Sequence, residues 1–218
     1  FGKSAPSNRL TIGLVGNGLI CNAHAGTLLG LTDDCRVVAT CDVVRAKAEK
    51  MRDRIETSYG KAKDAGGRSG DVRIFATHEE LVARDDIDIV FVCTPDHWHA
   101  PLAKAFMHAG RHVYCEKPLA HDLAETRELR ELARRTRVVT QMGNQGSASE
   151  SLRRSTELIQ AGALGQIREM YQWGIGVTAN EGSAEGEDPV PKGFNWDLWV
   201  GPSALRPFKK DVYHPYRW

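Results

Sequence analysis

The sequence predicts an α/β protein with a Rossmann-type, doubly wound parallel sheet. Apolar runs of strand length alternate with helix-forming segments over most of the first 161 residues; a glycine pair follows the first run and an acid follows the second. Alternation of strands and helices implies right-handed crossovers between parallel strands. The carboxyl ends of those strands then meet at one edge of the sheet, where ligands bind.

The expected elements follow the chain in a regular order. Strands are expected at Thr11–Val15, Val37–Cys41, Val72–Phe75, Ile87–Cys93, His112–Cys115 and Val138–Gln141. Helices are expected after Gly18 and at Ala46–Tyr59, Thr77 onward, Leu102–Ala109, Asp122–Arg135 and Glu150–Ala161, with a glycine-rich surface loop at Gly60–Gly70. Thr77 and Glu80 form a capping-box pattern, which makes His78 an exposed residue of the first helical turn.

The glycine pair follows the first expected strand directly. Gly16 would allow a tight turn, and Gly18 would let the backbone approach a pyrophosphate. The phosphate charge would then meet the free N–H groups of a helix that starts at Leu19 and Ile20. Cys21 stands at the third position of the pattern, where a small, buried side chain preserves the packing of helix on strand. The pattern alone also fits an ordinary loop or hairpin.

The second apolar run adds to this pattern because it ends at Asp42. The acid lies 24 residues after Gly18, close to the roughly 20 expected for the side chain that binds the adenosine ribose hydroxyls. The two features together predict dinucleotide binding. An acid at this position would repel a 2′-phosphate, so NAD is favoured over NADP, whereas nearby Arg45 keeps NADP open as the weaker interpretation.

Composition narrows the possible partners. The chain has 218 residues and a formal net charge of +1, which argues against nucleic acid or an anionic membrane as the main partner. It contains no apolar run of transmembrane length. The odd number of cysteines and their places near expected strands indicate reduced core thiols. Residues 1–9 have no initiating Met and indicate a flexible lead-in, consistent with a start after a removed segment.

Polar residues gather in the loops that follow the strands. The candidate cofactor-binding residues are Gly16, Gly18, Leu19, Ile20, Asp42, Thr94, Pro95, Asp96, His99, Glu116, Lys117, Asn144 and Gln145. Several have a structural alternative: Asp96 as a helix cap, His97 and His99 as hydrogen-bonded loop residues, and Lys117 as an exposed lysine before a proline. No convergent Cys or carboxylate pattern surrounds the two histidines, which argues against zinc.

Taken in order, these motifs resemble the Gfo/Idh/MocA oxidoreductases. The motifs are Ile12–Gly18, Cys41–Asp42, Thr94–His99, Glu116–Leu119 and Gly165–Ile167, of which the stretch Tyr114–Pro118 is the most distinctive. The resemblance runs from Leu10 to the end of the chain. It implies an NAD-binding domain over residues 10–145. It also implies, over residues 146–218, the first part of an α+β open-sheet domain that binds substrate and forms a dimer or tetramer, with Ile167–Trp173 as its first strand.

The reaction implied by the resemblance is hydride transfer between nicotinamide and a carbon that bears a hydroxyl, on a sugar, cyclitol or related polyol. Lys117 matches the catalytic lysine of the family, and Glu116 would orient its amine or the ribose. The assignment is chemically reasonable because a proton must leave the alcohol oxygen as hydride leaves carbon. A lysine can accept that proton where burial and a positive nicotinamide ring disfavour its ammonium form.

The last segment is similar to a subgroup of the family that is often exported by the twin-arginine route. The motifs are Asn195–Pro202 and Tyr213–Trp218, and they leave a periplasmic location open beside a cytoplasmic one. Trp196, Tyr213 and Trp218 are candidates to stack on a sugar ring. Aromatic residues among Gly and Pro also pack loops at least as often.

One feature of the family is missing from the sequence. Members normally continue past the position of Trp218 with an Asp-x-Gly-x-His segment and most of the substrate sheet, so we expect a truncated chain or a reduced relative. Two other functions stay open. One is a glycosidase that uses NAD for a transient oxidation of its substrate, and the other is a non-catalytic NAD-binding protein.

Overall fold

The computed structural model describes residues 9–61, 71–173 and 185–213. They fall into two compact units. The first unit contains the chain up to residue 143 together with residues 191–206, and the second contains residues 144–190 and the chain from residue 207 onward.

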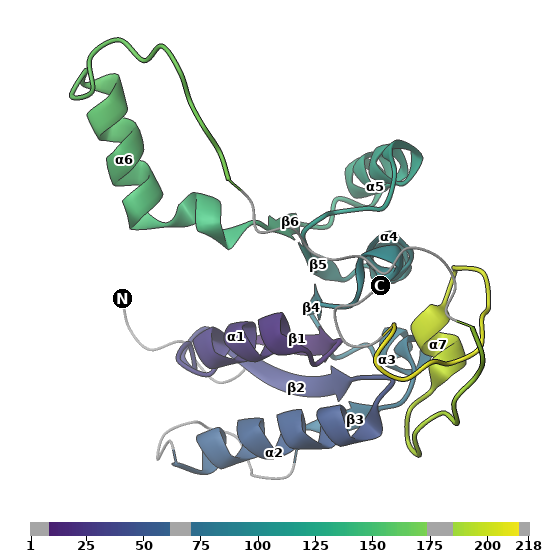
Figure 1. Cartoon of the computed structure of the whole chain (residues 1–218). Coiled ribbons are helices and arrows are strands. Elements are labelled where there is room, and N and C mark those ends of the chain that lie inside the picture. The colour runs from purple at the N-terminus through teal and green to yellow at the C-terminus, as the bar shows by residue number, and fades with distance from the viewer. Residues whose placement is uncertain (1–8, 62–70, 174–184, 214–218) are drawn as a thin grey trace. The chain divides into compact units, whose positions relative to one another are not determined.

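The first unit is built on a six-stranded, wholly parallel sheet (Figure 1). In chain order the strands are β1 (Leu10–Val15), β2 (Cys35–Cys41), β3 (Arg73–Phe75), β4 (Ile89–Val92), β5 (His112–Glu116) and β6 (Thr140–Gly143). Their order across the sheet is β3-β2-β1-β4-β5-β6. The order reverses between β1 and β4, and such a switch point is where a doubly wound sheet binds its ligand. The predicted fold class of this unit is confirmed.

Helices cover both faces of this sheet and form two hydrophobic cores. On one face, α1 (Leu19–Leu28) and α2 (Arg45–Lys61) pack on buried residues such as Leu14 and Val37. On the other face, α3 (His78–Val82), α4 (His99–His108) and α5 (Leu123–Thr136) pack on residues such as Val90 and Val113. Strand side chains alternate between faces, and β1, β2 and β4 each contribute to both cores.

Local capping signals fix several helix ends. The Thr77 side chain accepts a hydrogen bond from the Glu80 N–H, and the Glu80 carboxylate reaches back to the Thr77 N–H, so the predicted capping box is confirmed. Asp122 caps α5 by accepting from the Glu125 N–H at 2.8 Å. The prediction that His78 is exposed is wrong. Its ring is largely buried and lies 5.1 Å from the ring of Trp98, which lies in the loop after β4.

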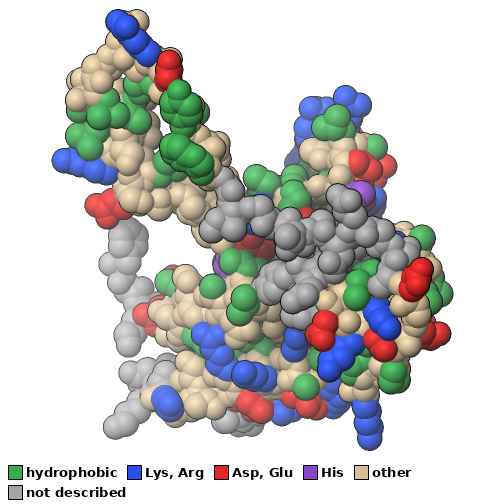
Figure 2. Space-filling view, viewed as in Figure 1, with side chains coloured by type: hydrophobic (Ala, Val, Ile, Leu, Met, Phe, Trp, Pro, Cys, Tyr) green, Lys and Arg blue, Asp and Glu red, His purple; other side chains and the backbone are tan. Residues whose placement is uncertain are grey.

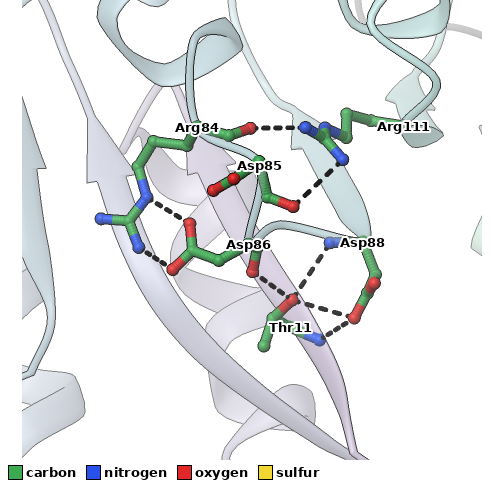
Figure 3. A network of polar contacts seen from close by, with 6 residues as sticks. All are labelled: Thr11, Arg84, Asp85, Asp86, Asp88 and Arg111. Carbon is green, nitrogen blue, oxygen red and sulfur yellow. Dashed lines mark hydrogen bonds and ion pairs between the residues drawn. The ribbon is translucent and has the colours of Figure 1, made fainter.

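The amino-terminal ends of the strands are joined by a polar network (Figure 3). Before β4, the Asp88 carboxylate accepts from the Thr11 N–H at 2.8 Å and from the Thr11 hydroxyl at 2.9 Å. Arg84 forms an ion pair with Asp86, and Arg111 donates to the Arg84 carbonyl oxygen at 2.6 Å. This edge is opposite to the carboxyl ends of the strands, so the network braces the sheet away from the predicted site.

Residues 191–206 return to the first unit although they follow residues 144–190 of the second unit in sequence. They include the short helix α7 (Trp196–Val200), which Asn195 caps by accepting from the Leu198 N–H at 3.0 Å. An isolated antiparallel bridge joins Phe194 to Val44. This return lies inside the range expected for the substrate domain, and the assignment of residues 146–218 to that domain stays a prediction.

The second unit contains the 3₁₀ turn η3 (Gln145–Ala148) and α6 (Glu150–Gln160). The expected strand Ile167–Trp173 is absent, because none of the described residues pairs with this segment. Alternating hydrophobicity does not form a strand without a partner for the backbone groups. Hydrophobic side chains lie on the surface over α6 and the segment after it (Figure 2).

Several expectations concern residues that the structure does not describe. Gly60 and Lys61 belong to α2. The rest of the expected loop Gly60–Gly70, residues 62–70, lies outside the described residues. Most of the lead-in 1–9 and Trp218 also lie outside them. Among the residues that are described, no helix combines the length and the apolar character needed to cross a bilayer.

Candidate dinucleotide-binding site

The turn after β1 has the geometry that a dinucleotide phosphate requires. Gly16 has φ +82°, and a Cβ there would lie 2.8 Å from the carbonyl carbon and oxygen of Cys93. Both the backbone conformation and the close approach of β4 therefore demand glycine. Gly18 precedes α1, and a Cβ there would meet nothing within 4 Å. No described side chain caps α1, and its first turn holds no acid. Its N–H groups are thus open to an anion.

Asp42 links the end of β2 to this turn. One carboxylate oxygen accepts from the Asn17 N–H at 2.7 Å, and the other accepts from the Val44 N–H at 2.7 Å. Burial raises the pKa of Asp42, while the two backbone N–H groups act in the opposite direction and favour the carboxylate. Each oxygen keeps a further lone pair, with which it can accept a ribose hydroxyl.

Asn17, inside the glycine pair, is a residue whose role the sequence did not predict. Its side chain is buried and donates to the Thr40 hydroxyl at 2.6 Å. Cys21 lies against the same side chain, with its Sγ 3.6 Å from Asn17 Oδ1. Asn17 therefore fixes the turn between β1 and α1 to β2. Its position in the turn is the only signal that the sequence offered, because Thr40 lies 23 residues away.

The loop after β4 runs through the 3₁₀ turn η2 (Asp96–Trp98) into α4. His99, the first residue of α4, is fully buried. Its Nδ1 lies 2.6 Å from the Pro118 carbonyl oxygen and its Nε2 lies 2.8 Å from that of Thr94. This geometry favours the structural alternative, a histidine that ties the β4 loop to the β5 loop. Pro95 and Asp96 are exposed, and the buried Thr94 Oγ1 has no partner among the described residues.

Glu116 and Lys117 end β5 and differ sharply in environment. Lys117 is exposed and is joined to Pro118 by a cis peptide bond. Glu116 is buried, and its Oε1 lies 2.5 Å from Nε2 of His24 in α1. The Glu116 carboxylate is therefore hydrogen-bonded to the His24 side chain of α1. The expected role of Glu116 in orienting the lysine amine or the ribose stays a prediction, and so does the catalytic role of Lys117.

The remaining candidates lie outside the loops that follow β1, β2, β4 and β5. Asn144 and Gln145 directly follow β6, are exposed and belong to the second unit. Trp196 is buried against Trp199, and its indole N–H donates to the Arg206 carbonyl oxygen at 2.7 Å. Tyr213 is buried within the second unit's sequence range. Burial of these two rings favours packing over stacking on a sugar.

The cysteines are packing residues. All five are buried and free, as the sequence predicted; they are Cys21, Cys35, Cys41, Cys93 and Cys115. Burial is the largest cause that raises the pKa of Cys41 and of Cys115, each to about 12, which disfavours the reactive thiolate. Within residues 9–61, 71–173 and 185–213, no group of three His, Cys, Asp or Glu residues is arranged to hold a metal ion.

Comparison with known proteins identifies the domain. The family described as "Oxidoreductase family, NAD-binding Rossmann fold" (GFO_IDH_MocA) matches residues 10–144. A glycosyl hydrolase family 109 protein of Shewanella sp. (strain ANA-3) is 39% identical over 106 residues, which are 44% of this chain and 22% of that protein. An inositol 2-dehydrogenase of Salmonella typhimurium is 27% identical over 158 residues, or 72% of this chain and 43% of that protein.

Solved structures agree with this result. The crystal structure of GenD2 from gentamicin A biosynthesis, in complex with NAD, superposes with a TM-score of 0.60 at 27% identity, over 74% of this chain and 42% of that one. The chain thus spans less than half of each of these proteins. Because the family matches more than half of the chain, and the sheet and the glycine turn have the expected geometry, the chain belongs to the Gfo/Idh/MocA oxidoreductases and carries their NAD-binding Rossmann domain.

Proposed function

We propose that the whole protein is a dehydrogenase that transfers hydride between NAD and a secondary hydroxyl of a cyclitol, sugar or related polyol. The observation that carries the proposal is the common position of three features. The glycine turn, Asp42 and Lys117 all follow carboxyl ends of strands in one parallel sheet. A cofactor held by the first two would lie along the edge that carries the lysine.

The residues at this edge fit the cofactor. Gly16 leaves a cradle that a Cβ would fill, and Gly18 leaves open space before the uncapped end of α1. The buried Thr94 hydroxyl oxygen, at the end of β4, has no partner among the described residues. The turn would hold the pyrophosphate, and Asp42 would accept the adenosine ribose hydroxyls. Bound NAD supplies the nicotinamide that exchanges hydride with the substrate, and Lys117 would move the proton of the substrate hydroxyl.

The charges near Asp42 favour NAD over NADP. A 2′-phosphate would meet the Asp42 carboxylate, which two backbone N–H groups already hold in place. Arg45, the residue that kept NADP open, forms an ion pair with Glu49 at 2.8 Å, one helical turn further along α2. The guanidinium is therefore partly neutralised. Affinity for NAD is expected to exceed affinity for NADP in an equilibrium titration.

Two classes of reaction are consistent with the relatives. An inositol 2-dehydrogenase among them supports net oxidation of a cyclitol. The glycosyl hydrolase family 109 names support a second candidate, in which transient oxidation by NAD permits elimination and hydrolysis of a glycosidic bond. A rise in NADH absorbance when NAD and a cyclitol are added favours the first. Release of a sugar with no net change in NADH favours the second.

Assembly into a dimer or tetramer stays a prediction, which native mass spectrometry tests.

Lys117→Ala in the full-length protein tests the proposal. We expect kcat to fall by about 10²- to 10⁴-fold, the usual contribution of a positioned acid or base, with the Kd for NAD within about twofold of the wild-type value. Lys50→Ala, which removes an exposed lysine from α2, is the matched control and should keep both constants. Unchanged turnover in Lys117→Ala would exclude the lysine. NAD binding without turnover of any polyol or glycoside would favour a non-catalytic NAD-binding protein.

A further inference from the structure

His24 and Glu116 form a buried polar pair between two elements that are far apart in sequence. His24 lies in the second turn of α1, and Glu116 is the last residue of β5. His24 Nε2 and Glu116 Oε1 are 2.5 Å apart, and the two side chains are 13% and 5% exposed. An ionised carboxylate only accepts hydrogen bonds, so His24 donates through Nε2. Burial of a carboxylate without such a partner would be costly.

Aromatic rings fix the direction in which His24 points. Phe91 of β4 and Tyr114 of β5 stack with their ring centroids 4.6 Å apart, at an interplanar angle of 17°. The imidazole lies over both, 5.5 Å from the Phe91 ring and 5.0 Å from the Tyr114 ring. Tyr114 and Glu116 are two residues apart in one strand and so share the sheet face that α1 covers. The imidazole is therefore held above the strand at the place where the carboxylate emerges.

Gly143, the last residue of β6, fixes the carboxylate from a third side. A Cβ at Gly143 would lie 2.5 Å from Glu116 Oε1 and 2.7 Å from its Cδ. Gly143 has a partner in Glu116 across the β5–β6 ladder, so the absence of a side chain there clears the space that the carboxylate occupies. Three elements, α1, β5 and β6, thus determine where Glu116 lies.

The position of Glu116 also determines where the backbone of Lys117, the next residue in the chain, begins. α1 begins at the glycine turn that would hold the NAD pyrophosphate, and Glu116 immediately precedes Lys117. We propose that His24 and Glu116 are a positioning pair that transmits NAD binding at the start of α1 to the backbone of Lys117, and so sets the lysine against the bound cofactor. Neither side chain needs to touch the reacting atoms. The inference rests on the proposed function for its kinetic readout but has a second readout that does not.

The kinetic test compares two substitutions of His24 in the full-length protein. His24→Leu removes the donor, and His24→Gln keeps an N–H that can reach the carboxylate. Because a misplacement of about 1 Å can cost about 10²-fold in rate, we expect kcat to fall about 10- to 100-fold in His24→Leu, with the Kd for NAD within about threefold, and to recover mostly in His24→Gln. His108→Leu, which changes an exposed histidine at the end of α4, is the control and should be unchanged.

A further variant separates positioning from stability. The double variant His24→Leu/Glu116→Gln no longer buries a charge without a partner, so its stability should exceed that of His24→Leu. Under our proposal its kcat stays low, because the bond between α1 and β5 is still missing. Recovery of kcat together with stability would overturn the proposal and leave the pair as a structural contact only.

Hydrogen exchange provides the readout that needs no turnover. In the wild type, saturation with NAD should slow exchange in peptides that contain Lys117 and Leu119, and this protection should be largely lost in His24→Leu and kept in His24→Gln. Equal protection in all three would overturn the proposal, whatever the activity. If the wild type binds NAD but turns over no polyol, the proposed function fails while exchange still decides whether the pair couples the two sites.

Discussion

Two pairs of aromatic residues follow β6 in sequence, and they differ in what surrounds them. Trp196 and Trp199 stack with their centroids 4.9 Å apart, and only 7% and 6% of their surfaces are exposed. Tyr171 and Trp173 also stack, at 6.2 Å, but they are 70% and 87% exposed. Stacking within a pair is therefore not what buries it. Contacts with the rest of the chain decide whether an aromatic pair belongs to a core.

The buried pair is fixed by backbone bonds to two loops of the candidate site. The carbonyl oxygen of Trp199 lies 2.8 Å from His97 Nε2, and that of Leu198 accepts from the Trp98 indole at 2.7 Å. Just before α7, the Asn195 N–H donates to the Val43 carbonyl oxygen at 2.8 Å, next to Asp42. By contrast, the one side-chain bond described for Tyr171 goes to Glu169, two residues away. Residues 191–206 are therefore part of the framework of the NAD-binding unit.

Replacing Trp199 should produce the largest change. Trp199→Ala removes a buried ring that stacks on Trp196 and meets the His97 ring edge-on, with centroids 5.8 Å apart. Loss of a buried Trp side chain typically costs about 3–5 kcal/mol, and we expect a decrease of that size in the free energy of unfolding. Urea denaturation followed by circular dichroism measures it. A decrease below about 1 kcal/mol would show that the buried pair is not part of the cooperative unit.

Acidification should produce a smaller loss of stability, to which His97, the partner of Trp199, contributes. Burial lowers the pKa of His97 below its ordinary value, and the Trp199 carbonyl and Asp96 oppose this only in part, while His99 and His121 add to the lowering. The unfolded chain then takes up the proton first. The stability from the neutral imidazole is thus complete above the ordinary pKa, about 6.5, and is lost as pH falls below it.

Melting temperatures of the wild type and of His97→Gln, measured from pH 7.5 to pH 5.5, check this prediction. Gln keeps a donor for the Trp199 carbonyl but does not titrate in this range, so the variant should show a smaller drop on acidification. His78, whose pKa burial also lowers, contributes to the drop in both proteins. Identical pH profiles would show that protonation of His97 does not disturb the loop.

Features that depend on local sequence were predictable. The capping box at Thr77 and the strand cores follow from neighbouring residues, and the two glycines and Asp42 follow from the spacing that a βαβ unit imposes. Each such signal spans a few residues or one crossover. The structure therefore reproduces the parallel sheet and the glycine turn that the sequence predicted.

Features that depend on distant partners were not predictable. His24 meets Glu116 across 92 positions, and His97 meets Trp199 across 102. The expectation that His78 is exposed failed for the same reason, since Trp98 contacts it from the loop after β4. The expected strand Ile167–Trp173 failed because alternation describes a face and not a partner. The sequence shows which residues can pack, but the fold decides which residues they meet.

The smallest effect is expected at the exposed pair, Tyr171 and Trp173. Trp173→Ala removes a ring that is 87% exposed and whose described ring contact is with Tyr171. Surface substitutions usually change stability by less than about 0.5 kcal/mol, so urea denaturation should barely distinguish this variant from the wild type. Trp199→Ala, measured in parallel, is the matched buried case. A loss of about 2 kcal/mol or more in Trp173→Ala would mean that another part of the protein, or a second copy, covers this ring, and that the two aromatic pairs differ only in which partner buries them.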